Sequence, residues 1–172
     1  MRRLLFLLVA LFLISCKQKK VDRVDDYYAS LYLPYTNVKV QQQQFLDTIA
    51  VALLAVAKDS NVVINTSALH TYLDTLEEAC QAGQSILTSV HEMDTSIRYK
   101  SKVLEYIAFS NMACKEEFIR VLNILEAKTG NRYDSIIAFL NPVVDDLKRR
   151  SDACAKASVT FRDKHNVGDA GK

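Results

Sequence analysis

Apolar residues recur at alternating steps of four and three positions through most of the chain after residue 22. This spacing puts them on one face of an α-helix, so it predicts amphipathic helices rather than strands. Polar connections centred near residues 62, 93 and 131 divide the pattern into four segments. The residues expected on the buried faces of these segments are, in order, Val24, Tyr28, Leu31, Tyr35, Val38, Gln42, Phe45, Ile49, Ala52 and Val56; Leu69, Leu73, Leu76, Cys80, Gly83, Leu87 and Val90; Leu104, Ile107, Asn111, Cys114, Phe118, Val121 and Leu125; and Tyr133, Ile137, Leu140, Val144, Leu147, Ser151, Cys154, Ser158, Phe161 and His165.

Four long amphipathic segments with short connections predict an all-α, up-down-up-down four-helix bundle, because short connections make consecutive helices antiparallel. The bundle is expected to cover residues 22–166, followed by a disordered tail at 167–172. Pro34 and Pro142 fall inside the first and fourth segments without a change in the repeat. Kinks are therefore expected near both, because proline lacks the N–H that a helix interior uses.

The connections carry recognisable signals of their own. Val62, Val63 and Ile64 stand between polar residues, and we expect a loop that covers the end of the core, with a short strand as the alternative. Asn65 or Thr66 is expected to cap the second helix. Asp94 is expected to cap the third helix in the same way, because such side chains accept hydrogen bonds from free backbone N–H groups.

The first sixteen residues show a different pattern. Two arginines precede an apolar run from Leu4 to Ile14, and a small residue then precedes Cys16. This is the layout of a secretory signal. A membrane span needs about 20 apolar residues, roughly twice this run. A span and an ordinary cleaved signal are the two alternatives to a lipoprotein signal.

The segment Leu13-Ile14-Ser15-Cys16 resembles the lipobox of bacterial lipoproteins. The resemblance implies a signal peptide at 1–15, cleavage before Cys16, and lipid on the cysteine: a diacylglyceryl thioether on its sulfur and an acyl chain such as palmitate on its amino group. Residues 16–21 would then form the lipidated cysteine and a tether. The location implied is the cell envelope. In a diderm bacterium the resemblance further implies the outer membrane, because the residue after the lipidated cysteine is Lys17 rather than Asp. Beyond the lipobox, the chain resembles small helical lipoproteins in general and no specific family.

Removal of the signal also changes the charge and the cysteine count. The chain has 22 Lys+Arg and 20 Asp+Glu, so losing Arg2 and Arg3 leaves 20 of each. No clustered positive charge indicates nucleic-acid binding. With Cys16 lipidated, Cys80, Cys114 and Cys154 remain, and we expect three buried free thiols. The alternatives are a Cys80–Cys154 or a Cys114–Cys154 bridge, which requires Cα atoms within about 7 Å.

When the four segments are aligned at the midpoints of their connections, with a rise of about 1.5 Å per residue, small and polar residues fall into one layer across the bundle. This layer lies in the half nearer the membrane. Its members are Gln42, Cys80, Gly83, Asn111, Ser151, Cys154 and Ser158. One interpretation is close helix packing with each polar group bonded locally. The other is a small pocket inside the bundle, where such folds hold ligands.

The motifs of the common catalytic and metal sites are missing from the sequence. The residues three positions before His70, His91 and His165 are Ser67, Thr88 and Arg162, so the Glu-x-x-His pairs of a di-iron bundle are absent. The sequence also lacks Cys-x-x-Cys, His-x-x-x-His, G-x-S-x-G and a phosphate-binding glycine loop. We therefore expect no enzyme activity, no cofactor and no metal.

Two groups of residues are candidate interaction surfaces. Tyr27, Tyr28, Tyr32 and Tyr35 cluster around Pro34 and either pack the kink or meet a partner. Val62, Val63 and Ile64 lie at the end expected to face away from the membrane. The function expected is a lipid-anchored envelope protein with a non-catalytic binding or structural role. Its partners would be the membrane, through lipid on Cys16, and an unknown envelope protein or small ligand. The alternatives are a small-ligand carrier using the core layer, an enzyme in which a histidine meets a carboxylate in a cleft, and a redox sensor.

Overall fold

The computed structural model describes residues 23–127 and 131–168. Within them the chain forms α2 (Val24–Lys58), α3 (Ser67–Thr88), α4 (Tyr99–Ala113), η1 (Cys114–Phe118), α5 (Ile119–Glu126) and α6 (Arg132–His165). The segments α4, η1 and α5 directly adjoin one another, so the described chain makes four helical rods and no strand. The all-α, four-helix prediction is confirmed. The predicted signal peptide, Cys16 and the tether lie outside the described residues.

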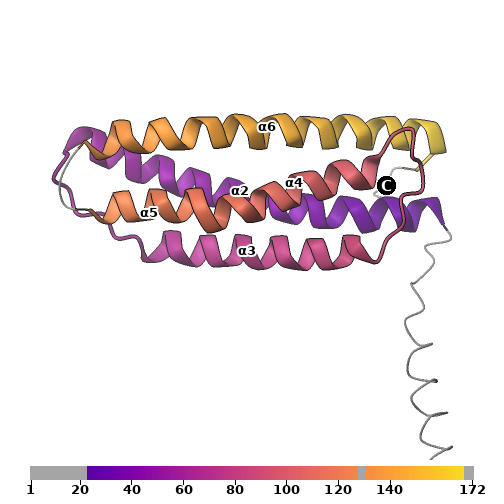
Figure 1. The fold of residues 1–172 in the computed structure, drawn as a ribbon, viewed down its shortest axis with the longest axis horizontal. Helices are drawn as coiled ribbons and strands as arrows, with labels where there is room; N and C mark the ends of the chain where they lie inside the picture. The colour runs from indigo at the N-terminus through magenta and orange to yellow at the C-terminus, as the bar shows by residue number, and fades with distance from the viewer. Residues whose placement is uncertain (1–22, 128–130, 169–172) are drawn as a thin grey trace, which may run out of the picture.

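The four rods lie side by side, and the chain reverses direction at each connection (Figure 1). The start of α2, residues 89–98 and the end of α6 lie together at one end, on the right of Figure 1, which we call the proximal end. Residues 59–66, the end of α5 and the start of α6 lie at the other end, which we call the distal end. The first described residues therefore enter at the end where α6 finishes.

The core runs the length of the bundle. The largest fully buried side chains come from every rod: Tyr27, Leu31, Phe45, Ile49, Leu69, Leu76, Leu87, Tyr99, Tyr106, Ile107, Phe118 and Phe161. Aromatic pairs tie neighbouring rods, with ring centroids 5.1 Å apart for Tyr27 and Phe161 and 4.7 Å apart for Phe45 and Phe118. Burial of these faces, rather than helix propensity alone, holds such long helices in place.

The predicted buried faces fit α3 best and α6 worst. All seven residues expected inside along α3 and its end are buried. In the first half of α6 the buried residues include Arg132, Ile136 and Val143, whereas Tyr133 is exposed. The predicted repeat of 3.5 residues drifts by about 20° per heptad against a straight helix of 3.6 residues per turn. The 35 residues of α2 nevertheless keep the predicted face at Leu31, Phe45 and Val56, so drift alone does not explain α6, whose mismatch is confined to its first half.

The third rod contains a π-helical segment that the sequence pattern did not predict. Ala113 just before it and Cys114 and Phe118 within it are all buried, so the core continues through the segment. Leu104 and Asn111, both expected in the core, are only half-buried. Cys114, Phe118, Val121 and Leu125 are buried as predicted, so the π segment does not change the predicted face of this rod.

Both prolines lie inside continuous helices, Pro34 in α2 and Pro142 in α6. A kink at either one stays a prediction. At the end of α6, Asn166 adopts a left-handed conformation (φ 50°), and Val167 N donates to Arg162 O at 3.1 Å. This turn folds Val167 back onto the core, where it is buried. Val167 therefore does not belong to the predicted disordered tail, and residues 169–172 lie outside the described residues.

The 59–66 connection is a loop, as expected. Val62 and Ile64 are half-buried and pack against the core, whereas Val63 is 79% exposed. Asn65 Oδ1 accepts from Ser67 N at 3.0 Å at the start of α3. The side chain of Thr66 makes no capping hydrogen bond. Of the two residues predicted to cap this helix, Asn65 is the one that acts.

Candidate functional site

The small and polar residues of the expected core pocket are packed against neighbouring side chains. A Cβ atom placed on Gly83 would stand 3.0 Å from Ile107 Cδ1 and 3.5 Å from Pro34 Cβ, so glycine permits close approach of the rods here. The described cavities lie elsewhere, and none is lined by Gln42, Cys80, Gly83, Asn111, Ser151, Cys154 or Ser158. These contacts favour helix packing, the first of the two interpretations.

Polar side chains of this layer bond to local partners. The pairs are Gln42–Tyr106 (2.9 Å), Ser151–Tyr35 (2.8 Å), Ser158–Tyr28 (3.0 Å) and Asn111–Gln84 (3.4 Å). Three of the four partners are tyrosines, none of which was predicted to belong to this layer. Tyr28 and Tyr35 are seven positions apart and therefore share one helix face, so the sequence contained a signal that both could reach this layer. Burial raises the pKa of Tyr106 above its usual range.

The predicted tyrosine surface does not form as a unit. Tyr27 and Tyr35 are buried, because they lie on the inner face of α2 with Leu31. Tyr28 is half-buried and stacks on Tyr32, with 5.5 Å between ring centroids. Only Tyr32, at 42% exposed, presents a large part of its side chain to solvent. Tyr27 and Tyr35 therefore pack inside the bundle and cannot belong to an interaction surface, whereas an interaction role for Tyr28 and Tyr32 stays a prediction.

Cys80, Cys114 and Cys154 are buried free thiols, as expected. The neighbouring Cys80 thiol, together with burial, raises the pKa of the Cys114 thiol above its usual range. Burial raises the pKa of Cys154 to about 12, and its thiol donates to Lys102 O at 3.1 Å.

Glu92 closes the proximal end. Its carboxylate accepts from the Tyr27 hydroxyl at 2.8 Å and from the backbone N–H groups of Lys100 and Ser101 at 3.1 and 2.9 Å. Burial, and then this hydrogen bond, raise the pKa of Tyr27. Glu92 thus caps α4 from the preceding connection. Asp94, the residue predicted for this role, instead accepts from Ser96 N within its own turn.

Asp94 joins the same connection to the end of α6. It is 8% exposed, and its Oδ2 lies 2.6 Å from Lys164 Nζ and 3.0 Å from His165 Nε2. Hydrogen bonds from Lys164, then from Ser96 and His165, hold the pKa of Asp94 well below its usual range. Every charged group in this network has a partner of opposite charge or a hydrogen-bond donor, so this end is electrostatically satisfied.

Arg132 closes the distal end in a different way. Its side chain is almost fully buried, at 3% exposed. The guanidinium donates to three backbone carbonyls: Leu125 O at 3.0 Å, Ser60 O at 2.5 Å and Val62 O at 2.8 Å. It therefore fastens the first connection and the end of α5 to the start of α6. Within the described ranges no carboxylate lies within 4 Å of Arg132, and its Nε has no hydrogen-bond partner.

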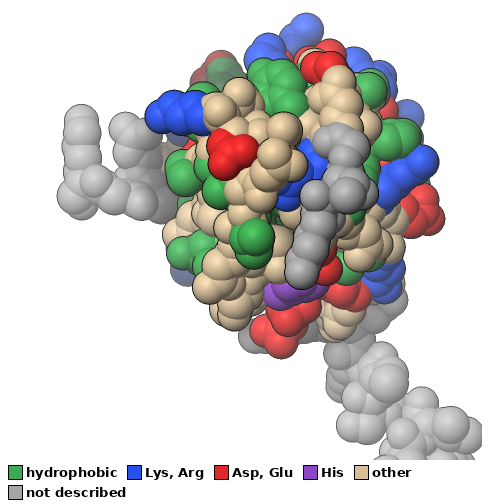
Figure 2. Space-filling view, turned by 90° about the vertical axis from the view of Figure 1, so that its left-hand side faces the viewer, with side chains coloured by type: hydrophobic (Ala, Val, Ile, Leu, Met, Phe, Trp, Pro, Cys, Tyr) green, Lys and Arg blue, Asp and Glu red, His purple; other side chains and the backbone are tan. Residues whose placement is uncertain are grey.

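Three cavities meet at Arg132. The first is a groove of about 400 Å³ between α5 and α6. The second, of about 470 Å³, lies between the end of α2 and the start of α6, and the third is a recess of about 30 Å³ beside Val62 and Ile64. Hydrophobic side chains reach the surface between charged ones at this end of the molecule (Figure 2). The structure therefore gathers its described cavities at the distal end.

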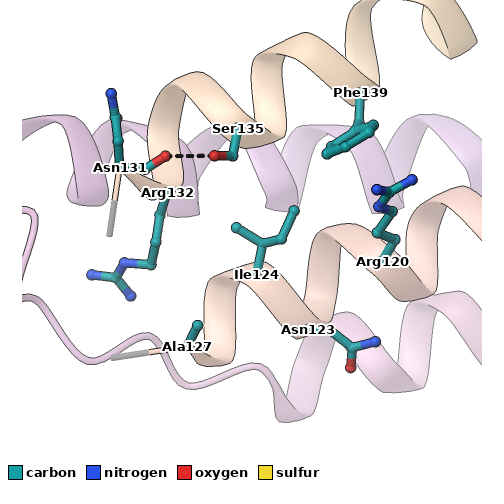
Figure 3. Close-up of a pocket in the computed structure, with 8 residues that line it drawn as sticks. All are labelled: Arg120, Asn123, Ile124, Ala127, Asn131, Arg132, Ser135 and Phe139. Atoms are coloured by element: carbon teal, nitrogen blue, oxygen red, sulfur yellow. Dashed lines mark hydrogen bonds between the residues drawn. The ribbon is translucent and has the colours of Figure 1, made fainter. Parts of the chain in front are cut away.

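The groove between α5 and α6 is lined by two arginines and no acid. Its lining residues are Arg120, Asn123, Ile124, Ala127, Asn131, Arg132, Ser135 and Phe139. Figure 3 shows Arg120 and Phe139 together at one end, Arg132 and Asn131 at the other, and Ile124 between them. The Arg120 guanidinium lies 3.7 Å from the Phe139 ring centroid, a cation–π contact. The sequence predicts no functional role for Arg120, Asn123, Ile124, Ala127, Arg132, Ser135 or Phe139.

Comparison with protein-family models, with curated proteins and with solved structures finds no match. Across residues 23–127 and 131–168, no helix is both long and apolar enough to cross a bilayer. The same residues contain no group of three or more His, Cys, Asp or Glu side chains placed to hold a metal ion. The geometry of the two ends is therefore the best guide to function.

Proposed function

We propose that this chain is a lipid-anchored protein of the cell envelope whose distal end binds a partner or ligand, without catalysis. The lipobox-like segment at Leu13–Cys16 supports the anchor. From Cys16 to Arg23 is seven residues, which span at most about 25 Å. The proximal end, where the described chain starts, would then lie close to the bilayer. In a diderm bacterium Lys17 would direct the protein to the outer membrane.

The observation that carries the binding role is the position of the cavities. All three lie at the end opposite the entry of the chain at Arg23. The 35 residues of α2 extend about 50 Å at 1.5 Å per residue, so the distal end would stand that far beyond the anchored end. A site held away from the bilayer is accessible to soluble molecules and to other envelope proteins. The core layer offers no comparable space.

The anchor is tested on Cys16 in the native host or in a bacterium that processes lipoproteins. Cells fed labelled palmitate should incorporate the label into the wild-type chain and deliver it to the membrane fraction. The Cys16→Ala variant should take up no label and should leave the membrane fraction. An unlabelled wild-type chain would contradict the anchor and leave the distal site as a separate question.

The binding role is tested by capture from membranes in mild detergent and identification of the captured proteins by mass spectrometry. Two exposed valines at opposite ends of the bundle give a matched pair of variants: Val63, 79% exposed at the distal end, and Val159, 56% exposed on the last turns of α6. Val63→Asp should reduce capture of the partner at least tenfold, and Val159→Asp should leave it unchanged. Equal capture by both variants and the wild type would contradict a distal binding role.

A further inference from the structure

Arg132 is a buried cation that the described chain leaves without a counter-charge. Its three hydrogen bonds go to neutral carbonyls, and no described carboxylate lies within 4 Å. The acids that line the neighbouring cavities are otherwise engaged. Glu126 accepts from His70 and Thr66, and Asp134 accepts from Asn131. Residues 128–130 are Lys, Thr and Gly by sequence, so they supply no acid either.

Buried charges in proteins are normally paired, because taking an ion out of water is costly unless an opposite charge or a full set of hydrogen bonds replaces the water. The hydrogen bonds of the Arg132 guanidinium are incomplete, because its Nε has no partner. It also lies at the first turn of α6, a 34-residue helix whose N-terminus adds partial positive charge. The missing component at this end is therefore negative.

Arg120 provides the accessible half of the same site. It is exposed, forms no ion pair with a described carboxylate, and is held over the Phe139 ring. A guanidinium stacked in this way keeps its N–H donors free at its edge for a carboxylate or phosphate. Ile124 and Phe139 supply an apolar surface between the two arginines (Figure 3). The groove volume of about 400 Å³ suits a small organic molecule.

We propose that the groove between α5 and α6 binds a small organic anion. Arg120 contacts its carboxylate or phosphate group, Arg132 supplies the buried positive charge, and Ile124 and Phe139 hold its apolar part. This inference rests on the proposed binding role of the distal end and names the class of ligand for it. It requires no movement of the bundle, because the groove is already open between α5 and α6.

The test uses the full-length chain in non-ionic detergent at low ionic strength, with saturation-transfer difference NMR and titration of the ligand. The probes are phenyl phosphate and benzoate, which carry the two anionic groups on the same ring, together with benzyl alcohol as a neutral analogue and inorganic phosphate as an anion without a ring. At least one aromatic anion should bind in the millimolar range or tighter, whereas benzyl alcohol should not. The preferred probe would identify the anionic group.

Arg120→Gln should weaken binding of that probe at least tenfold, because the contacting charge is lost, and Arg120→Lys should restore part of it. Arg149→Gln is the matched control. It removes one arginine from the exposed face of α6, where Arg149 pairs with Asp146, and should leave binding unchanged. Because Arg120 is exposed, these variants are expected to fold, which circular dichroism would verify.

Three results would overturn the inference: no binding of either aromatic anion, equal binding by Arg120→Gln and the wild type, or equally tight binding of inorganic phosphate and the aromatic anions. Partner capture separates this inference from the proposed function. Loss of anion binding with the Val63-dependent capture intact would overturn only the anion site. Anion binding with no Val63-dependent capture would overturn only the partner role.

Discussion

The two ends of the bundle are closed by side chains of opposite charge: carboxylates at the proximal end and an arginine at the distal end. At the proximal end, Glu92 and Asp94 are surrounded by hydroxyl, amide and cationic donors drawn from three segments of the chain. At the distal end, one cation, Arg132, gathers carbonyl oxygens from the 59–66 connection and the end of α5. The first arrangement surrounds two carboxylates with donors, one of which is the Lys164 ammonium, and no described cavity lies beside it. The second gives a buried cation neutral carbonyl acceptors only and lies beside all three described cavities.

This difference shows how one fold can carry a structural end and a binding end. A carboxylate that accepts from backbone N–H groups caps a helix and closes a turn at the same time, as Glu92 does. An arginine that donates to carbonyls also joins segments, but the positive charge stays uncompensated. Mutations at the two ends should therefore differ in their effects on stability.

The largest loss is expected from Arg132→Ala at the distal end. It leaves three carbonyl oxygens without their donors, and unmet hydrogen bonds at buried groups cost about 1–3 kcal/mol each. We expect the free energy of unfolding to fall by about 3 kcal/mol or more, measured by urea denaturation. Arg149→Ala, on the exposed face of the same helix, should change it by less than about 0.5 kcal/mol. Equal effects of the two variants would contradict the fastening role of Arg132.

A smaller loss is expected from Glu92→Ala at the proximal end. The variant removes the cap of α4 and leaves the Tyr27 hydroxyl without its acceptor. A lost cap costs about 1 kcal/mol and an unmet buried hydroxyl about another, so unfolding free energy should fall by about 2 kcal/mol. Glu78→Ala, on an exposed position of α3, is the control and should have little effect. A neutral Glu92→Ala would show that water replaces the carboxylate.

These contributions also explain which features could be predicted from the sequence. The helices and most of their buried faces arise from local spacing, which holds throughout α3 and along most of α2. The first half of α6 departs from the predicted register by one residue, where Arg132 rather than Tyr133 is buried. The π segment could not be predicted, because Cys114–Phe118 continues the same apolar spacing as the residues around it.

The residues that close the two ends could not be predicted for a different reason. Arg132 comes directly after a helix-stop signal, where an arginine is ordinarily a solvated residue at a helix start. Glu92 stands beside polar residues in a connection, with nothing local to distinguish it from Asp94. Each role depends in part on a partner more than 60 positions away: Tyr27 for Glu92 and Val62 for Arg132. Spacing within one helix contains no information about such contacts.

Acid should weaken the proximal end through Asp94. The pKa of Asp94 is lowered in the folded protein, so its charge adds stability above the unfolded value of about 4, and this stability is lost as the pH falls from there towards the folded value. The urea midpoint of the wild type should therefore drop below pH 4. Asp94→Asn should be less stable than the wild type at pH 7, and the difference should shrink as the pH falls below 4. A constant difference from pH 7 to pH 3 would contradict this assignment.

The smallest effect is expected from a histidine at the distal end, in contrast to its counterpart at the proximal end. His70 lies 2.8 Å from Glu126 and His165 lies 3.0 Å from Asp94, so the two pairs have similar geometry. They differ in exposure: the side chains are 47% and 44% exposed in the first pair and 24% and 8% exposed in the second. Ion pairs in solvent contribute little, because water screens the charges and the side chains lose freedom. His70→Gln should therefore leave the urea midpoint at pH 6 unchanged, whereas His165→Gln should lower it. If His70→Gln had the larger effect, the exposed pair would be part of the structural closure, and the distal end would no longer differ from the proximal end in the way described.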